Sequence, residues 1–259
     1  MRILLPPSET KRPGGDPESR LDWARLAFAR ALTGPRRAVA RALREVSRVG
    51  GDGMRALRLG ATLESELALN RAVLRSPVMP ALDRFDGVLY DALAAASLAP
   101  SARERAARRV LIASALFGLV GALDPIPAYR LGADARLPDL RLRAHWGARL
   151  PALLAALPGP LLDLRSEAYR DLGPVPDRPD AAYLRVLTEG PDGRRRPLNH
   201  FNKHAKGAFT RAVLEAERGF DTLDDLVAWA RGAGWNLEPG DPGELRLVIP
   251  PGHAAAGTA

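Results

Sequence analysis

Short apolar segments alternate along this chain with longer stretches in which apolar residues recur at helical spacing. The apolar segments predict strands at residues 2–5, 110–114, 161–164, 183–188 and 245–249. Helices are expected at residues 18–33, from Pro35 to Gly50, and at 62–75, 91–98, 101–109, 140–157, 202–218 and 221–231. This alternation is typical of a mixed α/β fold, with short strands and surrounding helices. We expect a single domain over residues 1–250 and a disordered C-terminal tail at residues 251–259.

Two further segments predict turns. The sequence GPDG at residues 190–193 indicates a hairpin, whose second strand returns through residues 196–200. The glycines and prolines of residues 115–128 predict a run of turns after the strand at 110–114.

The absence of cysteine restricts the chemistry. None of the 259 residues is a cysteine, which excludes a thiol nucleophile, an iron–sulfur cluster, thiolate zinc and a disulfide framework. No apolar run approaches the ~20 residues of a membrane helix. Only three apolar residues stand between Arg2 and Pro6, too few for the core of a signal peptide. We therefore expect a cytoplasmic protein with no membrane partner.

Common nucleotide and hydrolase motifs are also missing. The chain has no G-x-x-x-x-G-K-[ST] loop, no G-x-G-x-x-G after a strand, no H-E-x-x-H and no G-x-S-x-G. His200 and His204 lie four residues apart, a spacing that suits a metal on one helix face, but a third ligand is not evident nearby. We expect no metal and no cofactor, and no catalytic residue is assigned.

The basic residues favour a polyanionic partner. The 38 lysines and arginines exceed the 30 acidic residues, which gives a net charge of +8 and makes nucleic acid the leading partner class. Only three of the basic residues are lysines, namely Lys11, Lys203 and Lys206. Burial lowers the pKa of a lysine readily, whereas an arginine stays charged. We interpret the three lysines as markers of a functional site.

Two of these lysines stand at the start of the helix predicted at 202–218. A helix N-terminus favours anions through its dipole and its free backbone N–H groups. Lys203 and Lys206, together with Gly207 for close backbone approach, therefore predict a phosphate-binding segment.

Polar loops follow several of the predicted strands. The loop SETKR at residues 8–12 follows the first strand, residues 114–121 follow the strand at 110–114, and Arg165 and Ser166 follow the strand at 161–164. In open α/β sheets ligands bind at the carboxyl ends of strands. We expect these loops to form a cationic cleft.

Ordered short motifs resemble those of the YaaA family of bacterial peroxide-stress-resistance proteins. The resemblance runs from the first strand to the last. It rests on LLPPSET at 4–10 (family L-I-S-P-A-K-T), FDGVLY at 85–90 (F-x-G-x-V-Y), SALFGLVG at 114–121 (S-G-L-Y-G), AYRL at 128–131 (P-Y-R-L), HWG at 145–147 (F-W-G), DLRS at 163–166 with Tyr169 (N-L-A-S-x-E-Y) and FNKHAKG at 201–207 (Y-A-K-K-A-R-G).

This chain departs from the family pattern at three positions. The family lysine falls on Glu9, with Lys11 two residues later. The first serine falls on Pro6, and the acidic residue before Tyr169 falls on Ala168.

The resemblance implies a compact α/β fold with a positively charged cleft, binding to double-stranded DNA and protection against peroxide. A helix-hairpin-helix element is also attributed to the family, and Gly118 and Gly121 are the candidates for its hairpin. Aromatic residues make up only 5% of the chain, which favours duplex over single-stranded nucleic acid.

Two hypotheses follow. The first is a DNA-binding protein of the peroxide-stress response that contacts phosphates; the candidate residues are Lys11, Arg12, Arg130, Arg165, Ser166, Lys203, His204, Lys206 and Gly207. The alternative is an enzyme acting on a nucleotide or another small anionic substrate in the same cleft, lined by Ser8, Glu9, Thr10, Ser114, Ser166 and Lys203. An iron-sequestering role does not fit, because four histidines and no cysteine offer few ligands.

Overall fold

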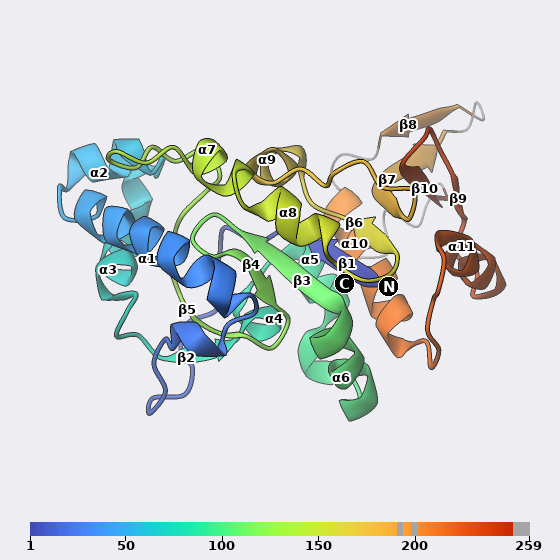
Figure 1. Ribbon diagram of the computed structural model, residues 1–259, viewed down its shortest axis with the longest axis horizontal. Helices are drawn as coiled ribbons and strands as arrows, with labels where there is room; N and C mark the ends of the chain where they lie inside the picture. Colours follow the sequence, from blue (N-terminus) through green and yellow to red (C-terminus); the bar gives the residue numbers. More distant parts are fainter. Residues whose placement is uncertain (191–193, 198–200, 251–259) are drawn as a thin grey trace.

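A computed structural model describes residues 1–190, 194–197 and 201–250. It confirms the predicted mixed α/β fold, in which helices surround one main sheet (Figure 1). The tail expected at 251–259 lies outside the described residues.

The secondary structure elements follow one another in short segments. The strands are β1 (Arg2–Leu5), β2 (Val78–Pro80), β3 (Val110–Ser114), β4 (Gly118–Gly121), β5 (Pro125–Pro127), β6 (Leu161–Asp163), β7 (Ala181–Glu189), β8 (Arg195–Pro197), β9 (Leu237–Pro239) and β10 (Glu244–Ile249). The helices are α1 (Ala29–Val46), α2 (Gly51–Ala56), α3 (Ser65–Ala72), α4 (Ala81–Arg84), α5 (Val88–Leu93), α6 (Pro100–Arg109), α7 (Leu142–Gly147), α8 (Leu150–Ala155), α9 (Glu167–Leu172), α10 (Asn202–Glu215) and α11 (Leu223–Gly232), with 3₁₀ turns at Trp23–Arg25, Ala61–Leu63 and Ala95–Ser97.

The main sheet has a parallel centre and antiparallel edges. Its strand order is β4-β3-β1-β6-β7-β10-β9, and β8 pairs with β7. β1 runs parallel to β3 and β6, and β7 runs parallel to β6 and β10. In this register Leu4 is opposite Asp163, and Asp163 is opposite Tyr183. The loops after β1, β3 and β6 therefore leave the sheet at one edge, as the sequence predicts.

The apolar pattern explains why these segments form the core. Every residue of β3 and β6 is buried, as expected for central strands covered on both faces. Ala205, Phe209, Val213 and Leu214, which face inward from α10, are buried too. The hairpin signal at 190–193 is followed by the antiparallel pair β7–β8, although residues 191–193 and 198–200 lie outside the described residues.

The prediction of two separate helices, at residues 18–33 and from Pro35 onward, is wrong. A 3₁₀ turn at Trp23–Arg25 precedes one long helix, α1, which passes through Pro35. The apolar residues Leu32, Val39 and Leu43 continue on one buried face across the proline. Their burial outweighs the single helical hydrogen bond that the proline removes.

The turn region expected at 115–128 is wrong in part, because it contains β4 and β5. β4 is completely buried and pairs with β3, from Ser114 opposite Gly118 to Leu111 opposite Gly121. A Cβ on Gly118 would lie 2.8 Å from Cζ3 of Trp146. This glycine therefore makes room for the packed tryptophan and has a positive φ of 74° at the start of the strand.

Candidate functional site

Lys11 lies in the loop after β1, with its ammonium group enclosed. Its Nζ donates hydrogen bonds to the carbonyl oxygens of Ser8 (2.8 Å) and Glu9 (3.1 Å) and lies 4.1 Å from the centre of the Tyr129 ring. Burial lowers the pKa of Lys11 to about 7; the charge of Glu9 opposes this change, and the charge of Arg130 adds to it. Backbone pairing with Phe85 fixes the position of the residue.

Buried hydroxyl groups surround this lysine. The Tyr129 hydroxyl lies 2.7 Å from Ser114 Oγ, which also accepts a hydrogen bond from the backbone N–H of Phe117 (2.9 Å). Tyr90 donates to the carbonyl oxygen of Pro6 at 2.8 Å. Burial raises the pKa of both tyrosines, so both phenols stay protonated at neutral pH.

Lys206 forms the second lysine site, on the first turns of α10. Its side chain is only 4% exposed. The Nζ donates to the carbonyl oxygen of Leu164 at 3.0 Å and lies 5.0 Å from the centre of the Tyr183 ring. Burial lowers the pKa of Lys206 to about 8, while the charge of Asp163 opposes the change and that of Arg170 adds to it.

Asp163 is the acidic centre beside Lys206, and its main partner is Arg165. The Arg165 Nε donates to Asp163 Oδ1 at 2.9 Å, and a terminal guanidinium nitrogen donates to Oδ2 at 2.8 Å. The guanidinium also donates to the carbonyl oxygens of Gly173 (2.9 Å) and Tyr169 (3.3 Å) and is fully buried. The predicted contact of Arg165 with phosphate is wrong, since this side chain joins β6 to α9 inside the protein.

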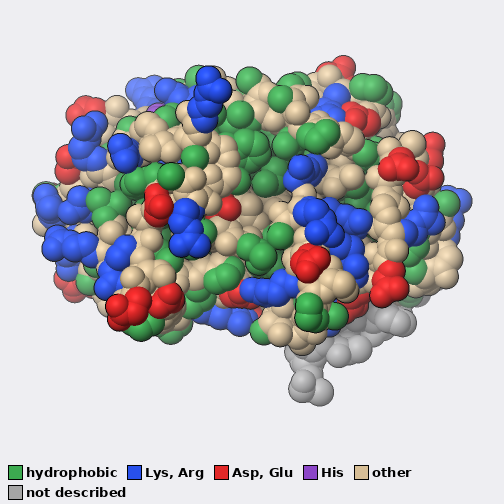
Figure 2. Space-filling view, turned by 60° about the horizontal axis from the view of Figure 1, so that its bottom comes forward, with side chains coloured by type: hydrophobic (Ala, Val, Ile, Leu, Met, Phe, Trp, Pro, Cys, Tyr) green, Lys and Arg blue, Asp and Glu red, His purple; other side chains and the backbone are tan. Residues whose placement is uncertain are grey.

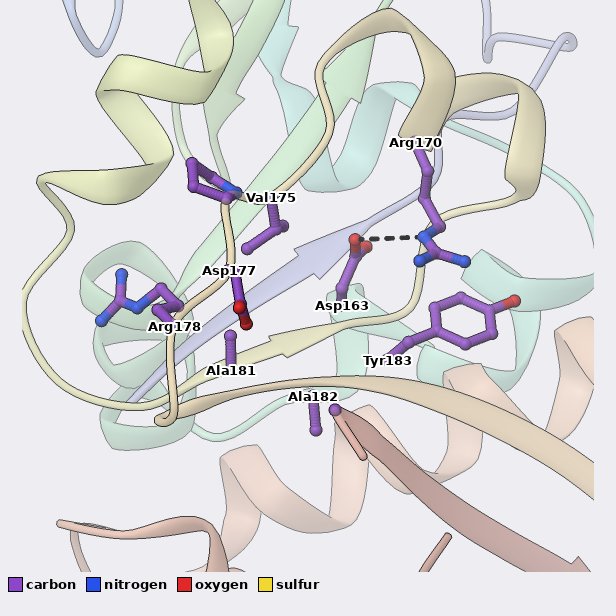
Figure 3. A pocket seen from close by; sticks show the side chains of 10 residues that line it. Asp163, Arg170, Val175, Asp177, Arg178, Ala181, Ala182 and Tyr183 are labelled. Atoms are coloured by element: carbon purple, nitrogen blue, oxygen red, sulfur yellow. Dashed lines mark ion pairs between the residues drawn. The ribbon is translucent and has the colours of Figure 1, made fainter. Parts of the chain in front are cut away.

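A cavity of about 150 Å³ opens beside Asp163. Figure 3 shows the Arg170 guanidinium above the Tyr183 ring, with Asp163 to one side of both and joined to Arg170 by the dashed line. The Arg170 guanidinium lies 4.2 Å from the ring centre, and its Nε lies 3.8 Å from Asp163 Oδ2. Asp177 and Arg178 line the far side of the cavity (Figure 3). The cavity therefore offers an aromatic face, a cation and carboxylates to a small polar ligand.

Helix α9 connects the two lysine sites. Arg170 on this helix contacts Asp163 and Tyr183 in the second site. The neighbouring Tyr169 has its pKa raised by burial and by the nearby charge of Glu9, so it belongs to the surroundings of Lys11. The carboxyl edge of the sheet thus carries two polar sites, and α9 contributes a residue to each of them.

The other predicted anion-binding residues are distributed over this edge. Arg12 forms ion pairs with Asp86 (3.1 Å) and Asp91 (3.6 Å), and Arg130 pairs with Glu9 (3.5 Å). These carboxylates reduce the positive charge that the edge presents to an anion. The remaining residues are Ser166, which is exposed at the start of α9, Lys203, which is exposed on α10, and His204, which is partly buried.

The structure gives three predicted glycines a packing role. Gly118 and Gly121 belong to the buried strand β4, so the predicted hairpin of a helix-hairpin-helix element is wrong for them. Gly207 faces α5, where a Cβ would lie 2.0 Å from the carbonyl oxygen of Leu89. Its close backbone approach is therefore to a helix and not to a phosphate.

Replacing Gly207 with alanine is expected to lower the free energy of unfolding by about 2 kcal/mol, because α10 must move away from α5. The matched control is Gly232→Ala at the end of α11, where a Cβ meets nothing within 4 Å. We expect this control to keep the stability of the wild type in urea titrations. Equal stability of the Gly207→Ala variant and the wild type would contradict the packing role.

Sequence reasoning missed several residues of the two sites. Tyr129, Tyr183 and Arg170 were not selected, and Asp163 appeared only within a motif. Asp163 ends a strand, and the motif AYRL contains Tyr129, so position alone could have pointed to both. Arg170 and Tyr183 carry no such signal in the sequence.

Among the residues that the structure describes, no group of three histidine, aspartate or glutamate side chains could hold a metal ion. His200, one half of the histidine pair, lies outside the described residues. No described helix is both long and apolar enough to cross a membrane.

Comparison with known proteins finds a matching family and several relatives. Residues 1–240 match the family described as peroxide stress protein YaaA. The chain belongs to this family. A UPF0246 protein of Corynebacterium efficiens is 40% identical over 256 residues, which cover 96% of this chain and 100% of the relative. A UPF0246 protein of Corynebacterium glutamicum strain R is 38% identical over 96% of this chain and 100% of the relative. A UPF0246 protein of Streptomyces coelicolor is 38% identical over 93% of this chain and 94% of the relative. The resemblance to the YaaA family noted in the sequence is thus confirmed.

Proposed function

We propose that this member of the peroxide stress family binds double-stranded DNA through phosphate contacts. The observation that carries the proposal is a set of exposed arginines. None of them has an acidic side chain within 4.0 Å among the described residues. They lie on several elements and include Arg25, Arg30, Arg37, Arg41, Arg48, Arg75, Arg149, Arg218 and Arg231. Unpaired guanidinium groups release counterions from DNA and supply affinity that does not depend on sequence.

The distribution of aromatic residues favours duplex DNA over single strands. Eight of the fourteen aromatic side chains are buried and the other six are partly buried, so no fully exposed ring is available to stack on bases. Phosphate contacts alone are sufficient for binding to a duplex.

Duplex binding is expected to weaken steeply with salt. Titrating two unrelated 20-base-pair duplexes by fluorescence anisotropy between 50 and 200 mM salt should give parallel lines of log affinity against log salt concentration. Each phosphate contact contributes a slope of about −0.9. A flat salt dependence, or affinities that differ strongly between the two sequences, would contradict binding by phosphate contacts.

A second candidate function, binding of a small anionic ligand, is supported by the two lysine sites. Two lysines with lowered pKa, one buried and one partly buried, at the carboxyl edge of a parallel sheet are typical of ligand or catalytic sites. Thermal unfolding with nucleoside phosphates and with inorganic phosphate separates the candidates. Saturable stabilisation that Lys206→Met removes, without loss of duplex binding, would favour the small ligand.

A further inference from the structure

Five arginines form one continuous stripe along α1. Arg30, Arg37, Arg41, Arg44 and Arg48 follow one another at intervals of seven, four, three and four residues. At 3.6 residues per turn these positions fall within an arc of about 60° on the helix. Arg48 stands just beyond the last turn of the helix, and the side chains of all but Arg44 are exposed.

The orientation of the stripe is fixed by the opposite face of the same helix. Leu32, Val39, Leu43 and Val46 are buried on that face. Arg36, also buried, donates to the carbonyl oxygens of Phe117 (2.9 Å) and Leu119 (2.6 Å) and so attaches α1 to the β4 strand. The helix cannot rotate without breaking these contacts, so the arginine stripe stays directed outward.

Among the described residues, no carboxylate forms an ion pair with the stripe. Within the described part of the chain none of its five arginines has an acidic side chain within 4.0 Å, and Glu45 is the one acidic residue of α1. Arg44 donates to the carbonyl oxygen of Arg71 on α3, which brings a further exposed cation beside the stripe. Figure 2 shows Lys and Arg side chains, with some Asp and Glu side chains among them, at the end of the molecule where α1 to α3 lie, and further Lys and Arg side chains across the same face. The carboxyl edge differs, since Arg12 and Arg130 are paired there with carboxylates.

The chemistry of the stripe suits nucleic acid better than a protein partner. Protein interfaces have an apolar core, whereas the other exposed residues of α1 are Ala31, Gly34 and Glu45, and Thr33 and Ala38 are partly exposed. From Arg30 to Arg48 the stripe spans about 27 Å at 1.5 Å per residue. At 3.4 Å per base pair this length corresponds to about eight base pairs of a duplex.

We propose that the arginine stripe of α1 is the surface on which this protein docks the phosphate backbone of duplex DNA. The inference rests on the proposed function and assigns it a location away from the carboxyl edge of the sheet. The guanidinium groups contact successive phosphates, so the stripe provides affinity and orientation without reading bases.

The test compares two variants that lose the same charge. Arg37→Gln/Arg41→Gln/Arg48→Gln removes three cations from the stripe. The control, Arg108→Gln/Arg218→Gln/Arg231→Gln, removes three exposed arginines from α6, from the segment between α10 and α11, and from α11; Arg108 is paired with Glu104 at 3.7 Å. We expect the stripe variant to reduce the salt slope of duplex binding by about 2.7, at 0.9 per lost contact, and the control to change it by less than about 0.5. Thermal unfolding should show wild-type stability for both, since all six side chains are exposed.

The remaining outcomes overturn the inference in distinguishable ways. If the wild type binds duplex and the two variants lose the same slope, net charge and not the stripe drives binding, and the proposed function stands without this location. If the wild type does not bind duplex at 50 mM salt, both the proposed function and the stripe are refuted. If polyglutamate competes with duplex at equal charge concentration, the stripe is a general anion surface and the assignment to DNA is wrong.

Discussion

Replacing Arg165 with methionine is expected to lower the free energy of unfolding by about 4 kcal/mol. The substitution leaves Asp163, whose side chain is 6% exposed, without the two hydrogen bonds of the guanidinium. The carbonyl oxygen of Gly173 also loses its donor, so a buried charge and a buried acceptor become unpaired together. Urea titrations of the wild type and the variant at pH 7 measure the loss.

Two further variants separate charge burial from loss of packing. Arg170→Met removes the other cation near Asp163, but the Arg170 side chain is 42% exposed and lies 3.8 Å from the carboxylate, so we expect a loss below about 1 kcal/mol. The double variant Asp163→Asn/Arg165→Met removes the carboxylate that Arg165→Met leaves unpaired and should recover part of the stability, while Lys206 loses the charge of Asp163. If Arg165→Met and Arg170→Met lowered the free energy of unfolding equally, the buried Asp163–Arg165 pair would contribute no more to stability than the partly exposed contact of Arg170.

The position of Arg165 illustrates which part of the site a sequence can predict. The strand that ends at Asp163 follows from its apolar run, and the parallel order of the sheet places the next loop at the carboxyl edge. The direction of the Arg165 side chain depends on an acceptor two residues earlier and on carbonyl oxygens four and eight residues later. Local spacing does not determine whether such a cation turns inward or outward.

Arginines that are paired with carboxylates far away in the sequence show the same limit of prediction from sequence. Arg12 is paired with a carboxylate 74 residues away, and Arg130 is paired with Glu9, 121 residues earlier in the chain. Asp86 precedes α5 and Arg130 follows β5 of the two-stranded sheet, so these pairs form only because distant segments meet in the fold, and no local pattern predicts them. Strands and amphipathic helices could be predicted because their apolar residues form a local pattern in the sequence. The net charge of the predicted cleft could not, since it depends on which distant carboxylates arrive there.

The scarcity of lysine was a more informative signal than the charge total. Two of the three lysines, Lys11 and Lys206, have enclosed ammonium groups and define the two sites, while Lys203 is exposed. An arginine at either position would place a larger and permanently charged group against Tyr129 or Tyr183. The selection of lysine at these positions therefore agrees with their enclosed surroundings.

Stability is expected to rise by several kcal/mol, up to about 6 kcal/mol, between pH 7 and pH 10 because of these two lysines. In the folded protein the pKa of Lys11 is about 7 and that of Lys206 is about 8, whereas both are 10.5 in an exposed chain. Between these values the unfolded chain binds protons that the folded protein has released, so the free energy of unfolding increases with pH. Below about pH 6 both states hold the protons, and the full cost of burying the charges remains.

Above pH 10 the direction reverses. The pKa values of Tyr90, Tyr129 and Tyr169 are raised by burial, so these phenols ionise in the unfolded chain first and stability falls again. Urea titrations at unit steps from pH 6 to pH 11 should therefore show a maximum near pH 10.

Substitutions of the lysines test whether Lys11 and Lys206 cause the rise in stability with pH. Lys11→Met and Lys206→Met should each remove part of it, and the double variant should be nearly independent of pH between 7 and 10, because methionine does not titrate. Lys203→Met, on the exposed face of α10, should keep the wild-type profile. If the double variant kept the full rise, the two ammonium groups would not be buried at a cost, and the physical basis for a ligand site at the carboxyl edge would be lost. If it abolished the rise, the two amines would be partly uncharged near neutral pH, available to accept a proton from a small acidic ligand on binding.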